Sequence, residues 1–181
     1  MTSLQDIDLA ILQIFNQPFL PYLNFIFILL LSSVYIFVIF LAYTFFRNKE
    51  KAKLYHLVFL AIAGYIIVAV LKILVARERP YTTFPDLISM ISTKTDLSFP
   101  SAHTFMAFLC LHFLPKNFPK WLLIISVIYL VVLIPVGILY IGLHFPSDVL
   151  AGAIIGLVIP VLFKEKITNK IFKLKNPKSQ N

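Results

Sequence analysis

Long apolar segments separated by short polar breaks run through most of the chain. No charged residue occurs from Tyr22 to Phe46, a stretch of 25 residues, and about 20 apolar residues are enough to cross a hydrocarbon core as a helix. Leu54 to Leu71 repeats the pattern after a charged break, and further apolar segments follow at about 102–114, 121–143 and 149–163. This pattern predicts an all-α integral membrane protein, a bundle of about five transmembrane helices.

The N-terminal residues 4–15 have a different pattern. Leu4, Ile7, Ile11 and Ile14 recur at helical spacing, with polar residues at other positions. Such a segment predicts a short helix lying along the membrane surface. The chain shows no repeat and no low-complexity tract, so we expect one membrane domain over residues 1–181.

Composition supports the membrane assignment. Hydrophobic residues make up 60% of the chain and charged residues only 13%, whereas soluble domains carry about a quarter charged residues. A net charge of +8 would suggest nucleic acid as a partner of a soluble protein. In a membrane protein it reflects topology instead, so nucleic acid is not an expected partner. The single Cys110 excludes an intrachain disulfide.

The basic residues are distributed unevenly between the two sides of the predicted bundle. The loop 47–53, the break at Lys116 and Lys120, and the tail 164–181 together hold 12 of the 16 Lys and Arg residues. With five spans these segments lie on the same side, and Lys and Arg concentrate on the cytoplasmic side. We therefore expect a basic cytoplasmic tail and an outward-facing N-terminus.

Three polar clusters lie on the opposite, outer side. They are Lys72 to Pro80, Pro100 to His103, and His144 to Asp148. The second and third begin the short segments 102–114 and 149–163, so we expect helix starts sunk below the outer surface and a site that opens sideways toward lipid headgroups. Helix starts bind phosphate through free N–H groups.

The residue types in these clusters suit phosphate chemistry. Lys72 and Arg79 supply cations, and the Arg fork matches phosphate oxygens. His144 can act as a nucleophile if a carboxylate fixes its tautomer, and Asp148 is one helical turn away. His103 then remains as the acid for the leaving group. No cysteine cluster or carboxylate array indicates a metal site.

Each cluster also has a simpler interpretation when it is taken alone. Ser101 and Ser147 can be plain N-caps, and Lys72 and Arg79 can be snorkelling residues at the end of a span. Either histidine can be an interfacial residue with its polar atoms satisfied. Phe145 is expected in an aromatic belt at the membrane surface. Only the three clusters together favour a phosphate site.

The motifs resemble a known family. Lys72-x6-Arg79-Pro80, Pro100-Ser101-Ala102-His103 and His144-x3-Asp148 look like the three signature motifs of the type 2 phosphatidic-acid phosphatase superfamily, over about residues 54–163. The resemblance implies that His144 forms a phosphohistidine, Asp148 orients it and His103 protonates the leaving group. It also implies that Lys72, Arg79, Ser101 and the Ala102 N–H hold the phosphate, without a metal or other cofactor.

The sequence departs from this family pattern at two places. Ala102 stands where the second motif usually has Gly, which is a mild change because the backbone N–H remains. Gly137 and Ile138 stand where the third motif usually starts with Ser-Arg. Three explanations stay open: Arg77 or Lys94 substitutes for the missing arginine, activity is reduced, or the sequence has been altered. Arg77 is the first candidate for a substitute phosphate ligand.

The resemblance implies a bacterial inner-membrane enzyme that removes phosphate from a lipid phosphate or pyrophosphate at the outer face. Undecaprenyl pyrophosphate and lipid A 1-phosphate are the expected types of substrate. A lipid phosphotransferase needs only another acceptor for the phosphohistidine. The alternative from a different class is a catalytically impaired lipid-binding or transport protein, which the missing arginine favours and the retained His144, Asp148 and His103 oppose.

Overall fold

A computed structural model describes residues 3–16, 21–84, 87 and 97–172, except the side chains of residues 21–24 and 166. Helices dominate these ranges. In chain order they are α1 (Leu4–Phe15), α2 (Pro21–Arg47), α3 (Lys51–Val75), α4 (Pro80–Thr83), α5 (Ala102–His112), α6 (Lys120–Ile128), the π-helical turn η1 (Tyr129–Leu133), α7 (Ile134–Tyr140), α8 (Pro146–Leu162) and α9 (Glu165–Ile171).

The five predicted apolar spans are confirmed as helical segments. Three of them are long and apolar enough to cross a membrane, namely Phe25–Arg47, Lys51–Thr83 and Lys120–Tyr140. The other two, α5 and α8, are apolar but shorter. The third long segment contains α6, η1 and α7, and at its π-helical turn the Tyr129 hydroxyl lies 2.5 Å from Ser33 Oγ of α2.

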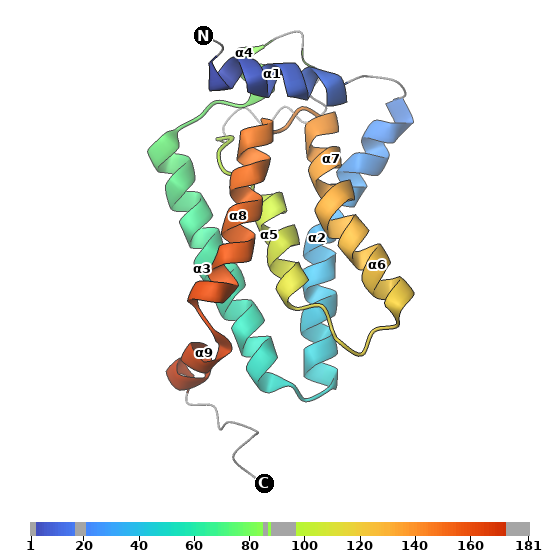
Figure 1. Cartoon of the computed structure of the whole chain (residues 1–181), viewed down its shortest axis with the longest axis vertical. Helices are drawn as coiled ribbons and strands as arrows, with labels where there is room; N and C mark the ends of the chain where they lie inside the picture. The colour runs from blue at the N-terminus through green and yellow to red at the C-terminus, as the bar shows by residue number, and fades with distance from the viewer. Residues whose placement is uncertain (1–2, 17–20, 85–86, 88–96, 173–181) are drawn as a thin grey trace.

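Helix α5 occupies the middle of the bundle and begins deeper than α8 (Figure 1). Its side chains Phe105, Leu109 and Cys110 are fully buried. Gly152 and Gly156, one turn apart on α8, face the α5 backbone. Because glycine has no side chain, the two helices can approach closely there. This contact fixes the start of α5 against the start of α8, where two of the polar clusters lie.

The predicted surface helix is confirmed as α1, which lies across one end of the bundle (Figure 1). Leu4, Ile7, Ile11 and Ile14 are exposed and available to the membrane surface. The adjacent face buries Leu12 and, unexpectedly, Asp8. At the end of the helix, Asn16 Nδ2 donates to the carbonyl oxygen of Tyr140, 2.8 Å away, so α1 is fixed to the end of α7.

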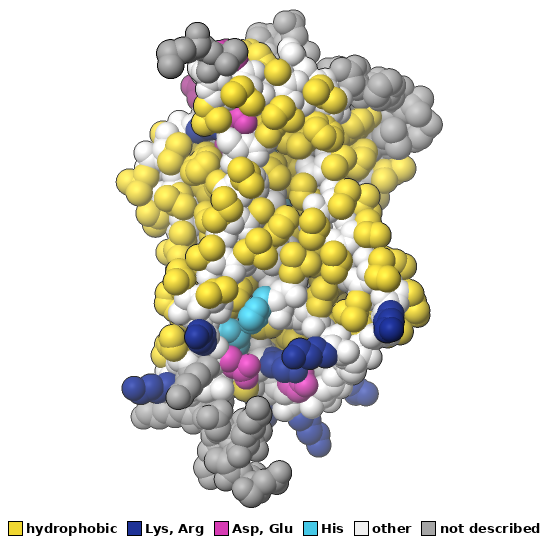
Figure 2. Space-filling model, viewed as in Figure 1, with side chains coloured by type: hydrophobic (Ala, Val, Ile, Leu, Met, Phe, Trp, Pro, Cys, Tyr) yellow, Lys and Arg dark blue, Asp and Glu magenta, His cyan; other side chains and the backbone are white. Residues whose placement is uncertain are grey.

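The other end of the bundle is basic. Figure 2 shows hydrophobic side chains over the middle of the visible face and most Lys and Arg side chains at the end opposite α1. Within the basic tail, residues 165–171 form the helix α9. This helix packs on α3, where the Thr168 hydroxyl is 2.8 Å from His56 Nδ1 and Phe172 stacks on Tyr55.

Candidate phosphate site

His144 is presented by a tight turn between α7 and α8. Gly142 has a φ of 66°, a left-handed conformation that ends helices and that glycine adopts at little cost. Its N–H and that of Leu143 bond back to α7, and Pro146 then starts α8. His144 is therefore held between two helices, with only 3% of its surface exposed, and Asp148 follows in the first turn of α8.

The two ring nitrogens of His144 meet different partners. Nε2 lies 3.3 Å from Arg79 Nη1. Nδ1 lies 3.6 Å from Asp148 Oδ2 and 3.5 Å from Ser98 Oγ. A guanidinium can only donate, so we assign the lone pair to Nε2 and the proton to Nδ1. The carboxylate is thus on the side of the ring where it can fix this tautomer, as expected from the spacing of the two residues.

Asp148 is itself firmly held. Oδ2 accepts a hydrogen bond from Ser98 Oγ and another from the N–H of Phe145, at 2.9 Å. Ser98 is fully buried and touches both members of the His144–Asp148 pair. Sequence reasoning missed Ser98, although it comes two residues before the second motif.

Burial is the main influence on the protonation of His144. It lowers the pKa of the ring below the usual 6.5, and the charges of Arg79 and Lys72 lower it further, while the Asp148 carboxylate acts in the opposite direction. A lowered pKa keeps the imidazole neutral at neutral pH. The neutral form is the one that can act as a nucleophile.

The first motif reaches the site through the end of α3. Ala76 adopts a left-handed conformation, with φ 47°, and turns the chain away from the helix. Arg79 is only 6% exposed and donates from Nη1 to the carbonyl oxygen of Leu143, 2.8 Å away. Lys72 Nζ donates to the carbonyl oxygen of Leu97. Arg79 is therefore not a snorkelling residue, because its guanidinium lies inside the protein.

The second motif begins α5. Ser101 is the N-cap, as its simpler interpretation predicted, and its Oγ accepts from the N–H and hydroxyl of Thr104. Its own N–H donates to the carbonyl oxygen of Asp148 at 3.1 Å, which ties the second motif to the third. Ala102 and His103 follow in the first turn and are partly exposed. The His103 ring lies 5.2 Å from that of Tyr35 on α2.

Arg77 has a different environment from the one expected of a phosphate ligand. Nη1 donates to Asp148 Oδ1 and to Ser147 Oγ, both at 2.7 Å, and Nη2 donates to Asp8 Oδ2 at 2.7 Å. Its guanidinium also lies 3.9 Å from the centre of the Phe145 ring. Arg77 thus faces two carboxylates.

Two simpler sequence interpretations are wrong at this point. Ser147 is not an N-cap, because α8 is capped at Phe145 and the Ser147 hydroxyl donates to Asp8. Phe145 is not a belt residue, because only 2% of it is exposed. Asp8 was not recognised as a site residue. The available signal was its position one helical turn before Leu12, beside the exposed apolar stripe of α1.

The position of the missing third-motif arginine is apolar. Ile138 is fully buried, and a Cβ at Gly137 would lie 2.8 Å from Cδ1 of Phe27. Lys94, the second candidate substitute, lies outside the described residues. The described cations nearest to the His144–Asp148 pair are therefore Arg79, Arg77 and Lys72, all from the end of α3 and the residues that follow it.

A family model described as the PAP2 superfamily matches residues 52–171. The chain belongs to the PAP2 superfamily. The three motifs lie within the matched region, which confirms the resemblance drawn from them. Together with its apolar helices, this membership makes the chain an integral membrane protein.

Two curated relatives share 32% identity with the chain. One is the bacitracin transport permease protein BcrC of Bacillus licheniformis, over 121 residues that cover 64% of the chain and 56% of the relative. The other is the undecaprenyl-diphosphatase of Sulfolobus acidocaldarius, over 91 residues that cover 50% of the chain and 44% of the relative. The chain spans about half the length of these two relatives that it matches.

Two solved structures share the fold. Aquifex aeolicus LpxE superposes with a TM-score of 0.74 at 25% identity, covering 89% of this chain and 98% of that one. The transmembrane PAP2-type phosphatidylglycerolphosphate phosphatase from Bacillus subtilis gives a TM-score of 0.73 at 23% identity, covering 98% of this chain and 90% of that one. The arrangement of helices is therefore that of membrane PAP2 proteins.

Proposed function

We propose that this protein is a membrane lipid phosphatase that acts through a phosphohistidine on His144. The observation that carries the proposal is the orientation of the ring, with Nε2 beside Arg79 and Nδ1 toward Asp148. This is what a histidine nucleophile requires. PAP2 membership and the name of the Sulfolobus acidocaldarius relative support phosphate release from a lipid.

The proposed reaction has two steps. Nε2 of His144 attacks the terminal phosphorus and forms an N–P bond. The bond from that phosphorus to the leaving-group oxygen breaks, and His103 gives its proton to that oxygen, which belongs to the lipid hydroxyl or, in a pyrophosphate, to the lipid monophosphate. Water then attacks the phosphorus of the phosphohistidine and His103 accepts a proton from the water. The N–P bond breaks, its electron pair returns to Nε2, and inorganic phosphate leaves. Asp148 stabilises the positive charge that His144 gains in the first step.

Phosphoryl transfer depends mainly on positioning and charge stabilisation. Arg79 stands beside Nε2, and Lys72 and the N–H groups at the start of α5, including that of Ala102, are the other proposed ligands of the phosphate oxygens. We do not retain Arg77 among these ligands, because its guanidinium already donates to Asp8, Ser147 and Asp148. With histidine as the nucleophile, no metal or cofactor is needed.

The proposed substrate is a long-chain lipid phosphate, with undecaprenyl pyrophosphate first and a lipid A 1-phosphate second. An apolar groove of about 580 Å³ between α2 and the α6–η1 segment supports a long chain. Ile36, one of its lining residues, follows Tyr35, which contacts His103. The basic loops at the other end of the bundle support an outer site in the cytoplasmic membrane of a bacterium, with a cytoplasmic C-terminus.

One observation favours a second candidate, an impaired lipid-binding or transport protein. A fully buried Ile138 stands where the family motif has an arginine, and losing one cation from a phosphoryl-transfer site is costly. A phosphotransferase remains the third possibility, since it shares the phosphohistidine and differs only in the acceptor.

The test is phosphate release by the purified protein from a panel of lipids: undecaprenyl pyrophosphate, a lipid A 1-phosphate and phosphatidic acid. His112→Ala is the matched control for His144→Ala, because His112 is exposed at the far end of α5. We expect wild type and the control to release phosphate and His144→Ala to lose about two orders of magnitude or more. Binding without release supports the impaired protein, and phosphate found on an added acceptor lipid supports the transferase.

A further inference from the structure

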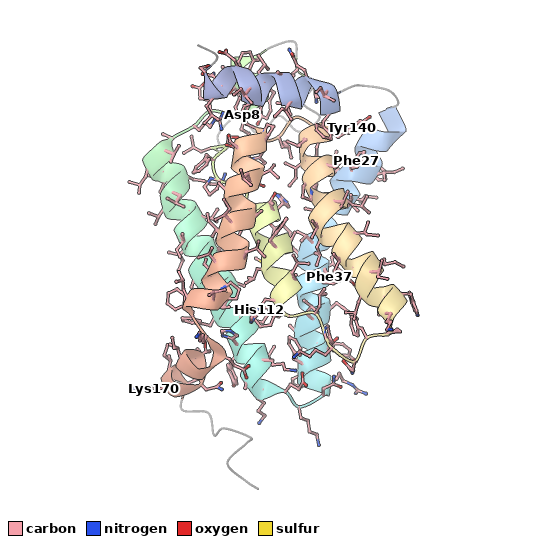
Figure 3. The ribbon with its side chains drawn as sticks, in the orientation of Figure 1. Asp8, Phe27, Phe37, His112, Tyr140 and Lys170 are labelled. Carbon is pink, nitrogen blue, oxygen red and sulfur yellow. The ribbon has the colours of Figure 1, made fainter. Side chains whose placement is uncertain are left out.

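Asp8 is a buried carboxylate on a helix at the surface of the bundle. Its side chain is 4% exposed, and both of its oxygens are used. Oδ1 accepts the N–H of Ser147 at 2.9 Å, and Oδ2 accepts the Ser147 hydroxyl at 2.5 Å and Arg77 Nη2 at 2.7 Å. Figure 3 shows Asp8 between α1 and the start of α8. A buried carboxylate is retained only with compensating partners of this kind.

Arg77 connects this carboxylate to the reacting centre. One end of its guanidinium meets Asp8 and the other meets Oδ1 of Asp148, while Oδ2 of Asp148 faces Ser98, the N–H of Phe145 and His144. Asp8, Arg77, Asp148 and His144 therefore form a continuous row of contacts from α1 to the imidazole ring. Asp8 and Asp148 share one guanidinium between them.

We propose that Asp8 is a positioning residue for catalysis: by holding one end of Arg77, it keeps Arg77 on a single oxygen of Asp148 and leaves the other oxygen for His144. This inference rests on the proposed function of His144. It makes α1 part of the working site, although α1 lies outside the region matched by the family model.

The reason lies in the geometry of the guanidinium fork. Arginine binds a carboxylate best through two parallel hydrogen bonds to both oxygens. In the native arrangement the second arm of Arg77 is engaged by Asp8, so only Nη1 reaches Asp148. Without the Asp8 charge the second arm is free to take Oδ2 of Asp148 as well. That oxygen would then be drawn away from Ser98 and His144.

The decisive experiment compares Asp8→Asn with Asp6→Asn in phosphate release from undecaprenyl pyrophosphate. Both remove one negative charge from α1, but Asp6 is exposed and bonds to Ser3 at the start of the helix, away from Arg77. We expect Asp8→Asn to lower kcat roughly ten- to a hundredfold, as for a misplacement near 1 Å, with KM nearly unchanged. Asp6→Asn should match wild type, and Asp8→Glu should recover part of the loss.

The pH profile separates positioning from plain loss of structure. The charged groups that act on His144 are Asp148 from α8 and Arg79 and Lys72 from α3 and its end, and none of them is changed in Asp8→Asn. A weaker Asp148 contact lowers the pKa of His144 further, so the acidic limb of kcat/KM should move to lower pH. The inference is overturned if Asp8→Asn lowers kcat/KM at every pH without moving the acidic limb of the profile. It is also overturned if kcat is unchanged.

Thermal unfolding in detergent tests the same contacts without turnover. Asp8→Asn and Arg77→Gln remove two ends of one interaction, so the double variant should be no less stable than the worse single variant. Fully additive losses overturn the inference. If wild type releases no phosphate from any lipid in the panel, the proposed function fails. The stabilities of the two single variants and the double variant then still decide whether Asp8 and Arg77 act as a unit.

Discussion

Gly152 on α8 lies against the backbone of α5, and a methyl group there would strike the carbonyl oxygen of Ser101. A Cβ built at Gly152 would lie 2.4 Å from that oxygen, whereas Cβ atoms essentially never approach within 3.0 Å. The shortfall is about 0.6 Å, and the obstacle is backbone that cannot rotate away. Gly152→Ala must therefore push the start of α5 away from α8.

Two consequences follow from this displacement. Overpacking a close contact costs about 1–3 kcal/mol of stability. The shift also separates His103 and Ser101 on α5 from Asp148 on α8, across the 3.1 Å bond between Ser101 N and the Asp148 carbonyl oxygen. Because a 1 Å misplacement costs about a hundredfold in rate, we expect Gly152→Ala to lower turnover roughly tenfold or more.

Gly137→Ala is the matched control. Its added methyl group would meet the Phe27 side chain at 2.8 Å rather than a backbone atom, and an aromatic ring can move. Both variants are to be compared in phosphate release and thermal unfolding in detergent, with Gly137→Ala expected to keep most of the wild-type turnover. Wild-type turnover and stability in Gly152→Ala would refute the view that this glycine sets the distance between the two motifs.

Four further results are expected. His103→Ala should lower turnover by about two orders of magnitude, and less so on a phosphate ester whose leaving group needs no proton; equal losses on both esters would contradict its role as the acid. A reporter fused to the C-terminus should be active only in the cytoplasm, and activity only outside would reverse the topology. EDTA should leave phosphate release unchanged, whereas loss that a divalent ion restores would count against histidine as the nucleophile. Because burial lowers the pKa of His144, the neutral form persists below pH 6.5 and is lost only as the pH falls through the lowered value. The acidic limb of kcat/KM should therefore lie below 6.5, and a limb above it would show that the ring is not buried as described.

The sequence alone determined the apolar helices, the helix over residues 4–15 and the motif chemistry. A bilayer offers no hydrogen bonds to the backbone, so apolar runs of sufficient length must be helical, and their number and order can be read directly. The helix over 4–15 agreed with its predicted bounds for a related reason, since its apolar spacing is local. His144 and Asp148 are one turn apart, so their proximity also required only local geometry.

The tertiary structure alone decided the partners that come from distant parts of the chain. Arg77 meets Asp8 across 69 positions and Asp148 across 71, and no periodicity encodes such contacts. The same holds for the α9 contact of His56 with Thr168, 112 positions apart. Residue type and position indicated that Arg77 could supply a cation to the site. The packing of α1 over the start of α8 decided that this cation meets Asp8 and Asp148.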